Sequence, residues 1–185
     1  MSVIVIGYTT LDGIVSDPDG ADGTPAGGWM FRLGPEIVTG DKFRLGSTLD
    51  EGVLLLGRRT WESFSKIWPN REDEFSARMN AVPKLVASRT LTDLSAWTNS
   101  QVIEGDLVDM VRHERRDVVV MGSLSVAREL MAGDVVDEYR LVTLPTILGT
   151  GERLFPASDR PTYVECQLVE QVGAVSYARY TRATG

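Results

Sequence analysis

Residues 53–63 read Val-Leu-Leu-Leu-Gly-Arg-Arg-Thr-Trp-Glu-Ser, and this stretch decides the fold class. Four apolar residues in a row are typical of a strand that is buried on both faces, as the central strands of α/β sheets are. Gly57 ends the run, and the residues after it open a helix. Similar short apolar runs recur along the chain at Val3–Ile6, Lys84–Ala87, Val118–Met121 and Tyr139–Leu144.

Helical patterns separate these runs. They are marked by Asn, Asp or Ser caps, by a proline at a first helical position, and by apolar residues at helical spacing. The predicted helices span Pro35–Asp50, Thr60–Ile67, Asn70–Asn80, Asp106–Arg115 and Ser123–Met131. Strands that alternate with helices predict an α/β fold, with a mixed, mostly parallel sheet and flanking helices.

The last quarter of the chain has a different pattern. Thr162–Val169 and Ala174–Arg182 read as antiparallel strands on either side of the short turn Glu170–Gly173. We therefore expect a C-terminal β-hairpin, with Cys166 as a buried, inert thiol in its first strand. A length of 185 residues suits one domain, residues 1–185.

The composition excludes several classes of protein. There are 19 Lys and Arg residues against 26 Asp and Glu, a net charge of −7, so we expect no nucleic-acid or membrane partner. One cysteine and one histidine, His113, are too few for a disulfide or a Cys/His zinc site, so we expect no metal. No apolar run is long enough to cross a membrane, and residues 1–7 read as a strand rather than a signal peptide. We expect a cytoplasmic protein.

Three of the predicted strands end in residues that suit phosphate. The three groups are Gly57, Arg58, Arg59 and Thr60, then Ser88 and Arg89, then Gly122, Ser123, Leu124 and Ser125. Glycine lets a backbone approach a ligand, amides at a helix start attract anions, and arginines make charge-assisted bonds to phosphate. Each group alone also has an ordinary explanation, as a polar turn or, for Ser123, as a helix cap.

Taken together, the three groups suit a ligand with phosphates in more than one place. Ligands of α/β sheets bind at the carboxyl ends of the strands. A dinucleotide with an additional 2′-phosphate would use all three groups. Because arginines are abundant and no acidic residue follows these three strands to bind a free 2′-hydroxyl, we expect NADPH rather than NADH.

The segments 54–63, 86–89 and 119–123 resemble, in this order, the cofactor-binding segments of dihydrofolate reductases. A closer resemblance is to the RibD C-terminal reductase family, dihydrofolate-reductase-like domains related to the reductase of riboflavin synthesis. The segments that resemble it are Thr10–Gly13, Phe75–Asn80, Pro83-Lys84, Val136–Leu141 and Pro145–Phe155. The resemblance covers about residues 3–181.

This resemblance implies an eight-stranded mixed sheet and an NADPH-dependent reductase. Arg58, Arg59 and Thr60 would then bind phosphates, Ser88 and Arg89 the 2′-phosphate, and Gly122–Ser125 the pyrophosphate. The substrate would be a small pterin- or pyrimidine-like ring, such as 5-amino-6-(5-phosphoribosylamino)uracil or dihydrofolate. Members of the family are commonly homodimers, so a second copy of the chain is the expected partner.

The substrate side should be built from the end of the first strand and the loop after it. Thr10, Asp12 and Gly13 follow that strand, and Trp29 offers a ring for stacking. The alternatives are a turn role for Asp12 and a core role for Trp29. Asp12, Asp41 and Tyr8 are the candidate proton donors, with an ordered water as another.

Two other functions stay open from the sequence. The acid that binds the pterin ring in dihydrofolate reductases has two candidates here, Glu36 and Asp41, and neither lies in a matching context. A non-catalytic NADP-binding protein of the same fold is therefore an alternative. An unrelated flavin-binding α/β domain is a further one, although the chain has no Gly-x-Gly-x-x-Gly motif.

Overall fold

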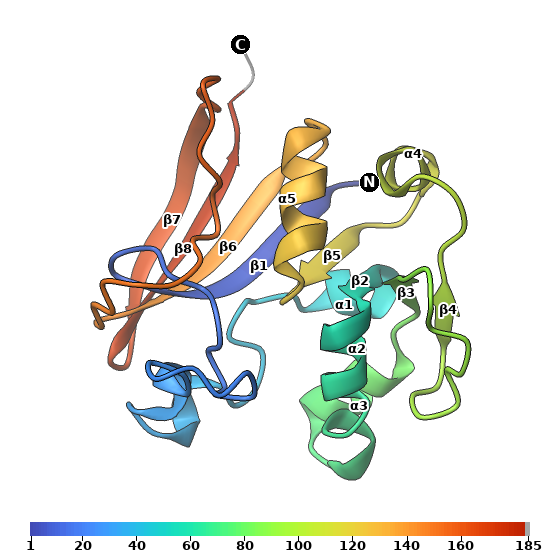
Figure 1. The fold of residues 1–185 in the computed structure, drawn as a ribbon, viewed down its shortest axis with the longest axis horizontal. Helices are drawn as coiled ribbons and strands as arrows, with labels where there is room; N and C mark the ends of the chain where they lie inside the picture. Colours follow the sequence, from blue (N-terminus) through green and yellow to red (C-terminus); the bar gives the residue numbers. More distant parts are fainter. Residues whose placement is uncertain (184–185) are drawn as a thin grey trace. The chain divides into compact units, whose positions relative to one another are not determined.

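Parallel strands buried on both faces form the centre of the first of two compact units. The computed structural model describes residues 1–183, and this unit consists of Met1–Val5 and Leu45–Asp137. It holds the parallel strands β2 (Val53–Gly57), β3 (Lys84–Ala87), β4 (Ser100–Val102) and β5 (Val118–Met121), in the order β4-β3-β2-β5 (Figure 1). Val53 to Leu56 have no exposed surface, as continuous apolar runs predict.

Aspartate caps fix where two helices of this unit begin. Asp73 accepts a hydrogen bond from the Ser76 amide and starts α3 (Glu74–Ala81), so the predicted start at Asn70 is wrong. Asp106 caps α4 (Leu107–His113) in the same way, as predicted. The other helices of the unit are α1 (Ser47–Glu51), α2 (Arg58–Phe64) and α5 (Leu124–Ala132).

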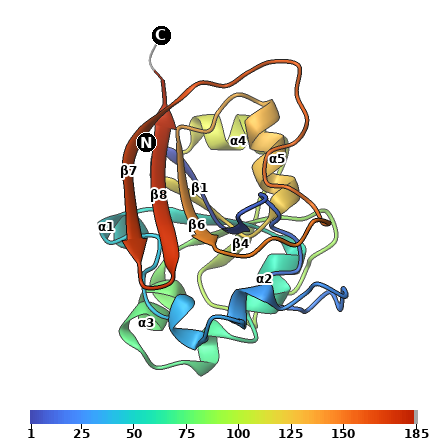
Figure 2. The same ribbon diagram turned by 90° about the vertical axis from the view of Figure 1, so that its left-hand side faces the viewer.

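The second unit, Ile6–Arg44 and Glu138–Gly185, contains the antiparallel part of the fold. Its strands are the remainder of β1 (Val3–Thr10), β6 (Glu138–Leu144), β7 (Val164–Val172) and β8 (Val175–Arg182). β7 and β8 form the predicted hairpin (Figure 2). Val172 pairs with Val175, so the turn is Gly173-Ala174 and not the predicted Glu170–Gly173; Gly173 has a φ of 61°, which suits glycine.

The predicted fold class is confirmed: the strands form a mixed, mostly parallel eight-stranded sheet in the order β4-β3-β2-β5-β1-β6-β8-β7. The predicted helix Pro35–Asp50 is wrong. Its ends form a short 3-10 helix, Pro35–Ile37, and α1, while Gly40, Arg44 and Gly46 have positive φ angles that an α-helix cannot include. A single domain over residues 1–185 stays a prediction.

Within residues 1–183, no helix combines the length and apolarity that crossing a bilayer requires. The same residues contain no group of three or more His, Cys, Asp or Glu side chains arranged to hold a metal ion.

A buried lysine ties together the loops at the amino end of β3. The Lys84 ammonium donates hydrogen bonds to the carbonyls of Asn80, Val82 and Thr98 at 2.7–3.1 Å. It also lies 4.5 Å from the centre of the Trp97 ring, a cation–π distance. Burial lowers the pKa of Lys84 to about 8, whereas the carbonyls and the ring favour the charged form.

We expect Lys84→Met to lower the free energy of unfolding by about 2 to 4 kcal/mol, because three carbonyl groups lose their donor. Urea denaturation measures this loss. Lys66→Met removes the same group from an exposed position and should change the free energy of unfolding by less than about 0.5 kcal/mol. Equal losses of unfolding free energy in the two variants would contradict the role of Lys84 in holding the three carbonyls.

Candidate functional site

The carboxyl ends of β3, β2 and β5 lie next to one another in the first unit. β2 is paired with β3 on one side, with Gly57 opposite Ala87, and with β5 on the other, with Leu55 opposite Val120. The three groups that the sequence indicated as phosphate-binding therefore meet at one edge of the sheet. All of them belong to the same compact unit.

The hydroxyl of Ser123 connects the ends of β5 and β2. It accepts a hydrogen bond from the Gly57 amide at 2.5 Å and donates one to the Thr60 hydroxyl at 2.8 Å. Ser123 occupies the cap position of α5, as predicted, but its hydroxyl makes no capping bond there. The side chain therefore links two strand ends instead of closing its own helix.

Glycines leave room for close contacts at the two strand ends that Ser123 joins, Gly57 at the end of β2 and Gly122 after β5. A Cβ atom on Gly57 would lie 3.1 Å from the Ser123 hydroxyl oxygen. Gly122 has a φ of 73°, and a Cβ atom there would lie 3.2 Å from a methyl carbon of Thr60. A Cβ atom at either position would require Ser123 or Thr60 to move by a few tenths of an ångström, so the glycines favour the close approach of the starts of α2 and α5.

The end of β3 is joined to the same edge through Arg58. Its guanidinium donates to the Thr90 hydroxyl at 2.9 Å and lies 3.7 Å from the Glu62 carboxylate. The Ser88 hydroxyl accepts hydrogen bonds from the amides of Thr90 and Leu91, which fixes the turn after β3. Thr90 was not assigned a role of its own from the sequence. Its hydroxyl, directly after Ser88-Arg89, is the sequence feature that could have indicated this contact.

The edge presents a cationic, hydroxyl-rich surface. Arg58, Arg59 and Arg89 are exposed, in a chain whose net charge is −7. Guanidinium groups and hydroxyls are the side chains best suited to phosphate oxygens. Gly122 and Ser125 are exposed at the start of α5, whose first amides point toward the same edge.

In the second unit, Asp12 is committed to holding a turn. It accepts hydrogen bonds from the Thr10 hydroxyl at 2.6 Å, the Gly149 amide at 2.8 Å and the Leu148 amide at 3.3 Å. The bond from Thr10 and then that from Gly149 lower the pKa of Asp12 to about 2. These bonds fit the alternative turn role of Asp12, and its expected role as proton donor stays a prediction.

Thr10 and Gly13 belong to the same turn. Thr10 is buried, and its hydroxyl also accepts a hydrogen bond from the Ile14 amide. Gly13 has a φ of 81°, which the turn requires. Contact of these two residues with a substrate stays a prediction.

Trp29 takes the core role that was the alternative to ring stacking. Its side chain has no exposed surface, and its indole N–H donates to the Ser16 carbonyl at 2.9 Å. It thereby anchors the loop that precedes it. A ring without an exposed face offers no stacking surface in this structure, so the expected substrate contact of Trp29 is not supported.

Asp41 lies half-buried in the segment between the 3-10 helix Pro35–Ile37 and α1. Arg140 of β6 pins this segment, because its guanidinium donates to the carbonyls of Phe43 and Arg44 and pairs with Glu138. Tyr8, another candidate donor, hydrogen-bonds the Ile37 carbonyl, and burial raises its pKa above the usual range.

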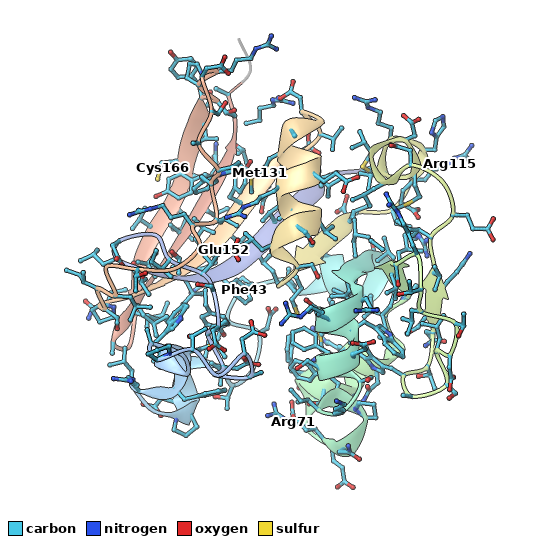
Figure 3. The ribbon with its side chains drawn as sticks, viewed as in Figure 1. Phe43, Arg71, Arg115, Met131, Glu152 and Cys166 are labelled. Atoms are coloured by element: carbon cyan, nitrogen blue, oxygen red, sulfur yellow. The ribbon has the colours of Figure 1, made fainter. Side chains whose placement is uncertain are left out.

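The cysteine prediction is wrong. Cys166 is exposed (Figure 3), because β7 is the outermost strand of the sheet and pairs on one side with β8.

Known proteins share this sequence pattern and fold. A family model described as the RibD C-terminal domain matches residues 1–176. The uncharacterized protein YyaP of Bacillus subtilis (strain 168) is 25% identical over 111 residues, which span 56% of this chain and 58% of that protein.

Two solved structures illustrate the fold. A protein assigned to riboflavin biosynthesis from Shewanella sp. PV-4 has a TM-score of 0.75 at 20% identity and covers 100% of both chains. A pyrimidine reductase-like protein from Corynebacterium diphtheriae has a TM-score of 0.60 at 11% identity and covers 100% of this chain and 92% of its own.

The turn role of Asp12 predicts a specific pH dependence for Asp12→Asn. Because the pKa of Asp12 is depressed in the folded chain, its ionised form stabilises the fold above the ordinary pKa of 3.8, and this contribution is lost as the pH falls toward about 2. Wild type should therefore melt at a higher temperature than Asp12→Asn near neutral pH, and the difference should shrink below pH 4. A constant difference across that range would contradict the role.

Proposed function

The chain belongs to the RibD C-terminal domain family, and on that premise we propose that it is an NADPH-dependent reductase of a small pterin- or pyrimidine-like heterocycle. One observation carries the proposal. Hydroxyl and guanidinium groups from the ends of β3, β2 and β5 are joined by hydrogen bonds at a single edge of the sheet. Such an edge suits an extended ligand with several phosphates.

The residues at this edge fit a dinucleotide that carries a 2′-phosphate. Arg58, Arg59 and Thr60 would bind phosphate oxygens, and Ser88 and Arg89 would bind the 2′-phosphate. The pyrophosphate would lie against Gly57 and the start of α5, at Gly122, Ser123, Leu124 and Ser125. The glycines support this placement, since a side chain at Gly57 or Gly122 would fill the space beside Ser123 or Thr60.

NADPH, when bound, supplies the hydride. The chain has to hold the dinucleotide in one orientation and provide a proton to the reduced ring. Asp41 is the preferred donor from the chain, because both oxygens of the Asp12 carboxylate already accept hydrogen bonds within its turn. The Arg140 clamp on the neighbouring carbonyls would position the Asp41 segment, and an ordered water is the alternative source.

A non-catalytic NADP-binding protein is the second candidate. It is favoured by the burial of Trp29 and by the commitment of Asp12 to its turn, which leave fewer groups for a substrate. A panel of pterins, dihydrofolate and ribosylaminopyrimidines separates the two functions. Oxidation of NADPH that depends on one of these compounds supports the reductase; tight NADPH binding without oxidation supports the second candidate.

We also propose a homodimer that forms through β7. This strand has one free side in the sheet order, and Val164, Leu168 and Val169 are exposed on it. Light scattering should give twice the mass of the chain, and Val169→Lys should shift the protein toward monomer. A monomeric wild-type protein would contradict this proposal without affecting the nucleotide site.

The cofactor site is tested by removing Arg58 and Arg59 together. Wild type should bind NADPH more tightly than NADH, measured by quenching of tryptophan fluorescence. The double alanine variant should weaken NADPH binding by about tenfold or more, because charge-assisted hydrogen bonds to phosphate are lost.

The control is Arg112→Ala with Arg115→Ala, which removes the same charge from exposed positions at the end of α4. It should leave NADPH binding nearly unchanged. Equal weak binding of both nucleotides to the wild type would refute the cofactor assignment.

A further inference from the structure

The strand β4, which the sequence pattern did not predict, adds a fourth carboxyl end to the candidate edge. β4 is parallel to β3, with Lys84 opposite Ser100 and Val86 opposite Val102. The pairing continues with a hydrogen bond from the Ile103 amide to the Val86 carbonyl at 3.0 Å. If this register continued for two more residues, Glu104 would come level with Ser88, just past the end of β3.

The direction of the β4 side chains shows which face of this strand α2 covers. Ser100 accepts a hydrogen bond from the indole N–H of Trp61, a residue of α2, at 2.8 Å. Side chains alternate along a strand, so Ser100 and Val102 share that face, and Glu104, two residues past the end of β4, would join them if the extended path continued. Arg58 is the first residue of α2 and reaches Thr90, just after β3. On that path the exposed Glu104 carboxylate would lie beside the part of the edge that Ser88, Arg89 and Arg58 form.

Asp106, the next acidic residue along the chain, has a different role. The Asp106 carboxylate caps α4 through the Asp109 amide, which ties it to the helix. An acidic residue at the end of a strand is the group that accepts hydrogen bonds from a ribose 2′-hydroxyl, and it repels a phosphate at the same position. The arginines and Glu104 therefore act in opposite directions on a 2′-phosphate.

We propose that Glu104 limits the preference of this site for NADPH by repelling a 2′-phosphate and accepting a hydrogen bond from a free 2′-hydroxyl. The proposal rests on the proposed function, since it concerns the same nucleotide. With Glu104 present, the affinity for NADPH exceeds the affinity for NADH by a smaller factor than the three arginines alone would give.

The test compares Glu104→Gln with wild type, using adenosine 2′,5′-bisphosphate and AMP as probes in addition to NADPH and NADH. Calorimetry should show the two 2′-phosphorylated ligands binding about three- to tenfold more tightly to the variant, because one like charge is removed. AMP and NADH should not gain affinity. The gain should disappear near 1 M salt, where charges are screened within about 3 Å.

Glu51→Gln is the matched control. Glu51 is exposed at the end of α1, just before the amino end of β2, so this variant makes the same change of net charge at the opposite ends of the strands. It should bind all four ligands as wild type does. Gains that are equal in the two variants, or no gain in Glu104→Gln, would overturn the role of Glu104.

The two proposals fail in different ways. If wild type binds neither NADPH nor adenosine 2′,5′-bisphosphate, and Glu104→Gln does not restore binding, the proposed function is wrong and the inference fails with it. If wild type binds NADPH and loses it on removal of Arg58 and Arg59, but Glu104→Gln has no effect, only the inference fails.

Discussion

The Ser123 hydroxyl is the contact on which the candidate edge depends. It accepts from the Gly57 amide and donates to the Thr60 hydroxyl, so a single side chain fixes the distance between the starts of α5 and α2. The arrangement works because residues 57 and 122 are glycines, which leave room for the hydroxyl and for Thr60. Replacing either glycine would shift Ser123 or Thr60 by a few tenths of an ångström even if every arginine stayed in place.

The second unit is organised by carboxylates and a guanidinium whose partners are mostly main-chain atoms. Asp12 closes the turn after β1 onto residues 148 and 149, and Arg140 holds the carbonyls of residues 43 and 44. Long segments without regular structure keep their shape in this way, because each buried or half-buried charge satisfies several backbone groups. The same bonds hold the Asp12 carboxylate in its turn and lower its pKa.

The buried strands and the edge residues were predictable because their signals are local. Val53–Leu56 and Val118–Met121 are continuous apolar runs, and Gly57 and Gly122 follow them directly. β4 was missed because it has three residues, two of them polar, and is recognised by its pairing with β3 rather than by its composition. The roles of Asp12 and Trp29 depended on partners far along the chain, such as Gly149, which no local pattern indicates.

The position of Cys166 has a practical consequence. It is the chain's single cysteine, it lies exposed on the outermost strand, and it belongs to the unit that does not carry the arginines of the candidate edge. In the single chain, a thiol-reactive dye or a surface linker therefore has one point of attachment, on the strand of the proposed dimer contact, and leaves Arg58, Arg59 and Arg89 unmodified. Storage without a reducing agent will, by the same exposure, allow two molecules to become cross-linked through a disulfide.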